Sequence, residues 1–233
     1  MYKLSLARKR KYLTIKLQSE VALVEELISL IVRWGHLLFG ITWIGMLYYF
    51  NFVQGGYFKS ASAEGLADAK AKLAPSALWW FRWGAMFTFL TGLYLLHTIS
   101  STLSANSYII LGALMGIFMF LNVWLVIWPA QQIALGMKEG GDPAAAGAKA
   151  LLASRTNTLF SGPMAFFMVA SAHKQQFLGG LGLDTGFYIC LAIVILIEIN
   201  ALIGKQGPMA SVKGVIHSSI ALTAILGLIL NYV

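Results

Sequence analysis

The stretch RWGHLLFGITWIGMLYYFNF, residues 33–52, decides the fold. It is almost wholly apolar and has the ~20 residues that a helix needs to cross a hydrocarbon core about 30 Å thick. Because it lacks the alternation of apolar and polar residues that marks a barrel strand, it predicts a membrane-spanning helix. The same helix carries Arg33 and, one turn later on the same face, His36. A cation and an imidazole on one face of an apolar helix indicate a function beyond spanning.

The composition of the whole chain is that of a membrane protein. Hydrophobic residues make up 58% of the 233 positions and charged residues 11%, whereas soluble proteins average roughly 45–50% and about 25%. Six apolar stretches approach spanning length, and they cover residues 24–53, 78–99, 107–128, 158–173, 186–203 and 211–232. The sequence therefore predicts an all-α fold, a polytopic membrane helix bundle of about six transmembrane helices.

The beginning of the chain is strongly basic. Six of the 17 Lys and Arg residues lie in MYKLSLARKRKYLTIK, the first sixteen positions. A basic segment just before a spanning helix meets anionic lipid headgroups, so we expect the lipid bilayer and no nucleic acid as its partner. Glu25 and Glu26 in the following apolar run, and the lack of a small-x-small cleavage site, argue against a signal peptide. We divide the chain into a basic membrane-surface segment, residues 1–20, and a transmembrane helix bundle, residues 21–233.

Two longer connections separate the predicted spanning helices. Residues 54–77 begin with glycines, continue with Ala, Lys and Glu, and reach Pro75 before the next apolar run, which predicts a short surface helix. Residues 129–157 contain the turn GGDP followed by an Ala-rich stretch, which predicts a second helical piece.

All four histidines lie within or at the ends of predicted spanning helices. Ionisable residues are costly in lipid and indicate a functional site. Imidazoles on facing helices of a membrane bundle suit axial ligation of heme iron, so we predict heme b as the cofactor. Because consecutive spans are antiparallel, His36, His97 and His173 lie toward one membrane face and His217 toward the other. His36 is the predicted primary ligand, with His173 or His97 across the iron.

Two neighbours of His36 fit the same cofactor. Arg33 is placed to pair with a heme propionate near the membrane surface, and Gly40, one turn after His36, leaves room for the macrocycle. Trp43 lies two turns from His36 on its face and is a further lining residue for a cofactor pocket. The predicted cofactor-binding residues are thus His36, His173, His97, His217, Arg33 and Gly40, and the predicted metal ligands are His36, His173 and His97. For each histidine the alternative is an interfacial role, hydrogen-bonded or facing headgroups.

The sulfur-containing residues restrict the metal chemistry. The single cysteine, Cys190, excludes an internal disulfide, a Cys-x-x-Cys metal site and covalent c-type heme. Met115 and Met119 share a helix face, as do Met164 and Met168, but such pairs pack between helices far more often than they bind Cu(I). We therefore do not expect copper.

Two further charged residues lie within predicted spans. Arg82 is near the start of its helix, which predicts contact with headgroups, with binding of substrate or propionate as the alternative. Glu198 lies about three quarters along its helix. Both proton transfer and a structural hydrogen bond to a neighbouring helix are open for it.

Four segments occur in an order that resembles a known family. They are RWGHLLFGITWIGMLYYFNF, LWWFRWGAMFTFLTGLYLL, NVWLVIWPAQQIALG and SRTNTLFSGPMAFFMVASAH, within about residues 30–175. Together they resemble the membrane domain of PuuD-type urate hydroxylases, the urate oxidase N-terminal family. The resemblance implies that His36, with Arg33 beside it, and His173 correspond to site residues of that family. In that family a c-type cytochrome follows the membrane domain and takes electrons away, whereas this sequence reaches Val233 without a heme-attachment motif. We therefore expect a separate cytochrome or larger membrane complex as the electron acceptor.

These observations predict a b-type heme protein, multi-pass in the bacterial inner membrane. It would work in electron transfer or substrate oxidation, resembling urate hydroxylase, with quinol or a small organic anion as further partners. No catalytic residue is assigned. One alternative is a non-catalytic accessory subunit of a larger membrane complex, and another is a transporter of copper or a small organic anion. The membrane orientation stays open. The basic beginning of the chain favours an N-terminus on the inside of the membrane, whereas the family resemblance favours an N-terminus on the outside.

Overall fold

The computed structural model describes residues 2–101, 106–173 and 182–233, and side chains from residue 11 onward except that of residue 101. Within these ranges the regular elements are all helical, which confirms the predicted all-α fold. The α-helices are α1 (Tyr2–Tyr48), α2 (Gly55–Ser60), α3 (Ala63–Asp68), α4 (Ala74–Ser101), α5 (Ser107–Leu121), α6 (Trp128–Ala134), α7 (Pro143–His173), α8 (Thr185–Ile203) and α9 (Val212–Tyr232). A 3-10 turn, η4 (Gly207–Ala210), precedes α9.

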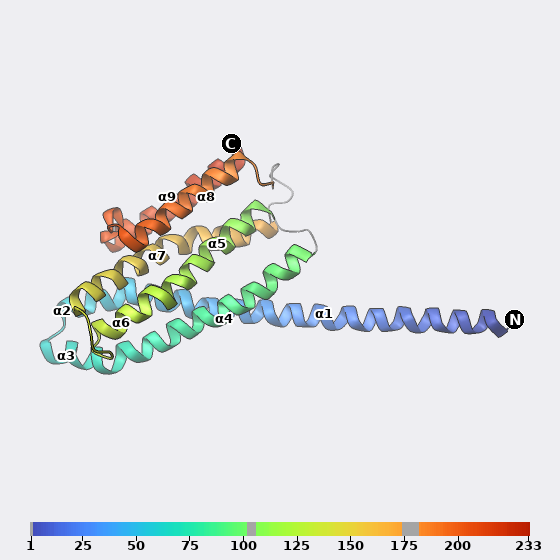
Figure 1. The fold of residues 1–233 in the computed structure, drawn as a ribbon, viewed down its shortest axis with the longest axis horizontal. Helices are drawn as coiled ribbons and strands as arrows, with labels where there is room; N and C mark the ends of the chain where they lie inside the picture. Colours follow the sequence, from blue (N-terminus) through green and yellow to red (C-terminus); the bar gives the residue numbers. More distant parts are fainter. Residues whose placement is uncertain (1, 102–105, 174–181) are drawn as a thin grey trace.

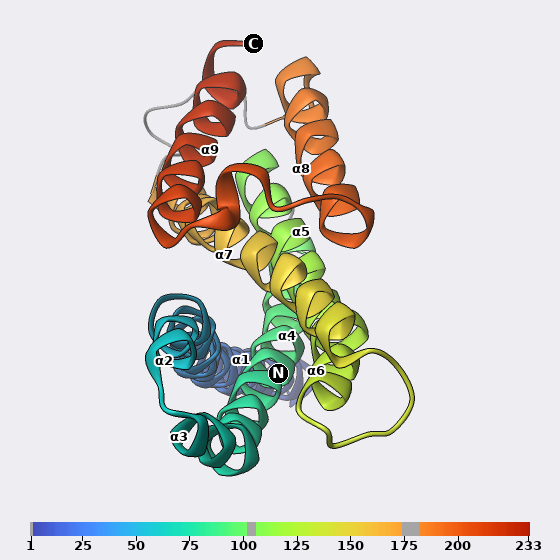
Figure 2. The same cartoon turned by 90° about the vertical axis from the view of Figure 1, so that its left-hand side faces the viewer.

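The long helices pack as three successive pairs. α1 packs on α4, α5 on α7, and α8 on α9, with α7 in contact with both outer pairs. Figure 2 shows the order of these pairs, with α5 and α7 between α1 and α4 on one side and α8 and α9 on the other. Close approach within the middle pair depends on Gly112, where an added Cβ would lie 3.3 Å from the main-chain oxygen of Met164. Small residues of this kind let apolar helices meet closely in membranes.

Four stretches of the described chain are long and apolar enough to cross a bilayer: Lys11–Ser60, Ser107–Ala134, Thr185–Ile203 and Val212–Tyr232. α4 and α7 have the length, at 28 and 31 residues, but α7 is less apolar. Several of its polar side chains, Arg155 and Asn157 among them, are buried against other helices. The apolar helices indicate a lipid bilayer as the environment of this bundle.

α1 is 47 residues long and extends beyond the rest of the bundle (Figure 1). Its apolar side chains between Lys11 and Ile31 are largely exposed. The predicted boundary at residue 20 falls within this helix, so it does not coincide with a break in secondary structure. The division into a membrane-surface segment and a bundle stays a prediction.

In the part of the chain that the structure describes, three short π-helical segments interrupt the α-helices. They are η1 (Tyr49–Gln54) between α1 and α2, η2 (Ala69–Leu73) between α3 and α4, and η3 (Asn122–Ile127) between α5 and α6. The short helices α2 and α3 confirm helical structure in the connection 54–77, and the start of α7 includes the Ala-rich stretch after GGDP. π-turns are rare and occur frequently at functional sites.

A buried amide cluster ties the middle of the bundle together. Asn122 Nδ2 donates to Asn157 Oδ1 at 3.0 Å and to Glu198 Oε2 at 3.1 Å. Asn157 Nδ2 donates to the Met119 carbonyl at 2.9 Å. Glu198 thus makes a hydrogen bond to a neighbouring helix, the structural role left open by the sequence.

Arg82 also contacts a neighbouring element. Its guanidinium carbon lies 3.7 Å from the ring centroid of Trp128, the first residue of α6. This is a cation–π contact. Arg82 therefore has a partner within the bundle in addition to the headgroup contact expected from its position.

Candidate cofactor site

An apolar cavity of about 630 Å³ lies between α1, α4, α5 and α7. We call it the His36 cavity. Its walls are the face of α1 from Arg33 to Tyr48, the second half of α4, the first turns of α5 and the last turns of α7. The volume is within the range of about 300–1,000 Å³ that is usual for ligand and cofactor pockets.

His36 enters this cavity from α1, and its imidazole is oriented by α4. Its Nδ1 lies 3.0 Å from the main-chain oxygen of Thr88 and 3.0 Å from Oγ1 of Thr91. A main-chain carbonyl can only accept, so Nδ1 carries the proton and Nε2 keeps its lone pair. Metal-bound histidines characteristically donate their other ring N–H to a carbonyl in this way. The contact thus prepares Nε2 for an electrophile such as a metal ion.

The Thr91 hydroxyl completes this arrangement. Its oxygen lies 2.6 Å from the Phe87 carbonyl, to which it donates. The hydroxyl has a single proton, so its oxygen accepts from His36 Nδ1 while it donates to Phe87. Two oxygens from one turn of α4 therefore hold the same imidazole N–H.

Glycine lets the two helices approach at His36. A Cβ on Gly92 would lie 3.0 Å from His36 Cε1, a separation that would force the ring to move. The predicted Gly40 also lines the cavity, and the nearest atom to a Cβ there, Thr88 Cγ2, is 4.0 Å away. The role of Gly40 in binding a cofactor stays a prediction, and the tighter contact is at Gly92, which the sequence did not indicate.

Two further polar groups accompany His36 in the cavity wall. Arg33 lines the cavity from an exposed position, and its Nε lies 3.4 Å from Ser29 Oγ. Trp43 is 2% exposed and lines the same cavity as expected, and its indole N–H has no hydrogen-bond partner among the described residues. A buried donor without a partner is rare in folded proteins, and this one is available to a polar group in the cavity.

The other three histidines are exposed and do not line this cavity. His97 and His173 lie near the ends of α4 and α7, where the preceding residues Leu96 and Ala172 contribute to its wall. His173 Nδ1 donates within its own helix, to the Val169 carbonyl at 2.9 Å. His217 lies in the second turn of α9. Their roles as ligands stay predictions.

The wall formed by α7 carries sulfur. Met164 and Met168 line the His36 cavity and pack against the glycines of α5, as expected for a packing pair. Among the described residues no group of three or more His, Cys, Asp or Glu side chains is placed to hold a metal ion. His36 is therefore the imidazole that the structure brings into the cavity, and the thioethers are the other soft donors there.

A bundle of apolar helices with a cavity lined by one oriented histidine defines a polytopic helical membrane protein with a cofactor-sized site. Residues 98–203 match the model of the urate oxidase N-terminal family, which confirms the resemblance predicted from the sequence. The matched range is less than half of the chain and includes His173 but not His36 or Arg33. Neither a curated protein nor a solved structure shows significant similarity to the chain.

Proposed function

We propose that this chain is a b-type heme-binding integral membrane protein for electron transfer or substrate oxidation, similar to the membrane domain of urate hydroxylase. The observation that carries the proposal is the hydrogen bond from His36 Nδ1 to the Thr88 carbonyl. It leaves Nε2 of the same ring as a neutral nitrogen donor on a cavity of about 630 Å³.

The residues present fit a heme group. A heme needs a nitrogen ligand for iron, apolar walls for the macrocycle and a cation for its propionates. His36 offers the nitrogen ligand, and Arg33 offers the cation. The faces of α1, α4, α5 and α7 form the apolar walls. Trp43 offers an unpaired N–H to a polar edge of the ligand.

Each of these residues has a distinct task in the proposed site. His36 would bind the iron, Thr88 and Thr91 hold its ring in one orientation, and Arg33 would pair with a propionate. The apolar side chains of the walls would cover the macrocycle. A bound heme would supply one-electron redox chemistry, which the hydrogen bond behind His36 would tune.

The family match favours urate, or a related small organic anion, as the substrate class. Oxidation of such a substrate releases electrons that an acceptor must take up. We assign that task to a separate cytochrome or a larger membrane complex, with quinol as the alternative electron donor or acceptor. The bacterial inner membrane, where such complexes work, is the proposed location.

The direct test is the absorption spectrum of the chain purified in detergent from heme-replete cells. We expect a b-type spectrum, a positive pyridine hemochrome assay and about one equivalent of iron. A colourless, iron-free preparation would contradict the proposal. If that preparation also remained bound to a larger enzyme in fixed stoichiometry, it would support the accessory-subunit alternative.

A further inference from the structure

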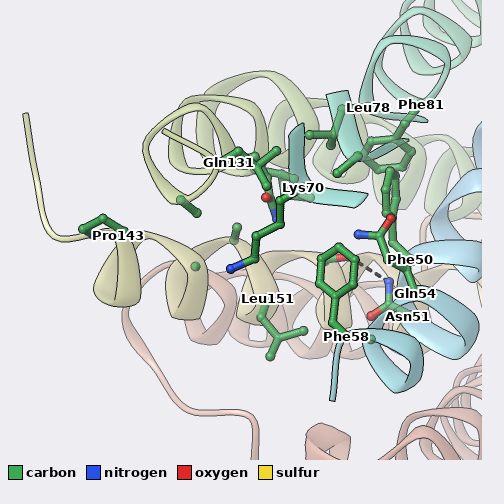
Figure 3. A pocket seen from close by; sticks show the side chains of 18 of the residues that line it. Phe50, Asn51, Gln54, Phe58, Lys70, Leu78, Phe81, Gln131, Pro143 and Leu151 are labelled. Carbon is green, nitrogen blue, oxygen red and sulfur yellow. Dashed lines mark hydrogen bonds between the residues drawn. The ribbon is translucent and has the colours of Figure 1, made fainter. Parts of the chain in front are cut away.

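Figure 3 shows a second cavity, of about 320 Å³. We call it the Asn51 cavity. Its walls come from η1, the start of α4, α6 and the start of α7, and it shares no lining residue with the His36 cavity. Asn51 follows His36 by fifteen positions along α1 and η1, which corresponds to roughly 22 Å of helix.

All three π-turns of the described chain contribute to this cavity. η1 provides Phe50, Asn51 and Gln54, η2 provides Lys70, and η3 provides Ile127. A π-turn inserts an extra residue and changes the direction in which the following side chains point. Three such turns, from separate parts of the sequence, converge on one cavity, which marks it as a built site.

Two buried amide oxygens in this cavity have no partner. Asn51 is 3% exposed, and its Nδ2 donates to the Leu47 carbonyl at 2.9 Å and to Ser154 Oγ at 2.8 Å. Within the described part of the chain no donor reaches its Oδ1, nor Oε1 of Gln54 one turn later. Buried polar atoms are almost always hydrogen-bonded, so these two oxygens require donors that the surrounding protein does not provide.

The charge in the cavity wall is positive. Lys70 is the one charged residue among those that line it, and the lining contains no Asp or Glu. In Figure 3, Asn51 and Gln54 lie together on one wall, and the Lys70 side chain reaches into the same space from another element. The rings of Phe50, Phe58 and Phe81 provide apolar surfaces around these polar groups.

We propose that the Asn51 cavity binds a small organic anion that carries N–H groups. The N–H groups donate to Asn51 Oδ1 and Gln54 Oε1, and the negative charge lies next to the Lys70 ammonium. The phenylalanine rings cover the body of the ligand. The site needs no heme, so the inference is independent of the proposed cofactor. Its ligand is of the same class as the substrate of the proposed function, and in that respect the inference rests on the proposed function.

The test is a binding titration of the full chain in detergent with four small molecules. Urate and orotate are anions with ring N–H groups, uracil has ring N–H groups without the charge, and benzoate has the charge without N–H groups. We expect urate or orotate to bind at least about tenfold more tightly than both uracil and benzoate, because only they use both halves of the site.

Two lysines of η2 give a matched pair of variants. Lys70→Met removes the cation that lines the cavity, whereas Lys72→Met removes a lysine that pairs with Asp68 at the surface. We expect Lys70→Met to lower the affinity for the anion about tenfold and Lys72→Met to leave that affinity unchanged. Gln54→Glu keeps the size of its side chain but places a negative charge in the cavity, and we expect it to abolish anion binding.

The outcomes separate this inference from the heme proposal. Failure of both anions to bind saturably, or equal effects of Lys70→Met and Lys72→Met, would overturn it. Thermal unfolding of each variant shows whether it is folded. If Lys70→Met or Lys72→Met does not fold, anion binding is compared between Gln54→Glu and the unchanged chain instead. His36→Ala should retain anion binding, and Lys70→Met should retain the heme spectrum, so either site can fail alone.

Discussion

His36 of α1 donates from Nδ1 to the Thr88 carbonyl of α4 at 3.0 Å. This contact joins residues 52 positions apart and lies where the two helices pack. A main-chain carbonyl is not removed by a change of the side chain at its own position. The orientation of the imidazole is therefore fixed by the packing of α1 on α4, and disturbances of that packing should affect the cofactor.

Replacing His36 by alanine should abolish heme binding, because it removes the nitrogen donor from the cavity. Cys190→Ala is the control. Cys190 is fully buried on α8, where its thiol lies 3.5 Å from the Leu226 carbonyl, and it does not line the His36 cavity. The measurement is the heme-to-protein ratio after purification. Retention of heme by His36→Ala, or its loss from Cys190→Ala, would show that the iron is bound elsewhere.

Gly92→Ala should disturb the same site without removing a ligand. The added methyl would lie 3.0 Å from His36 Cε1, so the ring must turn or α4 must shift. Gly35→Ala is the matched control, because its added Cβ would make an ordinary contact of 3.6 Å with the Phe39 ring. We expect a changed Soret band or reduced heme content for Gly92→Ala alone. Identical spectra for the two variants would argue that His36 is free to rotate and is not held by α4.

The sequence singled out those residues of the proposed heme site that contrast with their surroundings. Arg33 and His36 stand out because a cation and an imidazole are rare in an apolar run, and the structure places both on one cavity. Gly92 could not be found in this way, since a glycine in a membrane helix carries no signal until the helix packed against it is known. The pairing of α1 with α4 is a tertiary fact that hydropathy does not contain.

The Asn51 cavity was missed for a different reason. Asn51 and Gln54 are neutral amides near the end of a predicted span, where polar residues are ordinary. Their significance depends on η1, and a π-turn leaves no mark on a hydrophobic pattern of 3.6-residue period. The sequence likewise predicted too short a spanning helix for α7. Its polar residues before position 158 are buried against other helices, but in the sequence their polarity is typical of a connection.

The second axial ligand can be identified from single substitutions of the remaining histidines. The sequence predicts His173 or His97, so alanine at one of these two should convert a low-spin heme spectrum to a high-spin one. His217→Ala should leave the spectrum unchanged, because α9 contributes no residue to the cavity lining, whereas Leu96 and Ala172, next to the other two histidines, do line it. If neither His97→Ala nor His173→Ala changes the spectrum, the predicted histidine pair is wrong. Leucine at Met164 and at Met168 then tests the thioethers in the cavity wall.

Asn157→Ala should destabilise the bundle while leaving both cavities chemically intact. Asn157 is fully buried, and its loss removes the acceptor of Asn122 and the donor to the Met119 carbonyl. A buried group left without its partner costs about 1–3 kcal/mol, with values toward the lower end common inside membranes. Asn200→Ala is the control, because the contacts of Asn200 with Lys205 are exposed, and an exposed substitution usually changes stability by no more than about 0.5 kcal/mol. Unfolding in SDS, followed by circular dichroism, measures the difference. Equal midpoints for the two variants would mean that the amide cluster contributes no more than a surface contact.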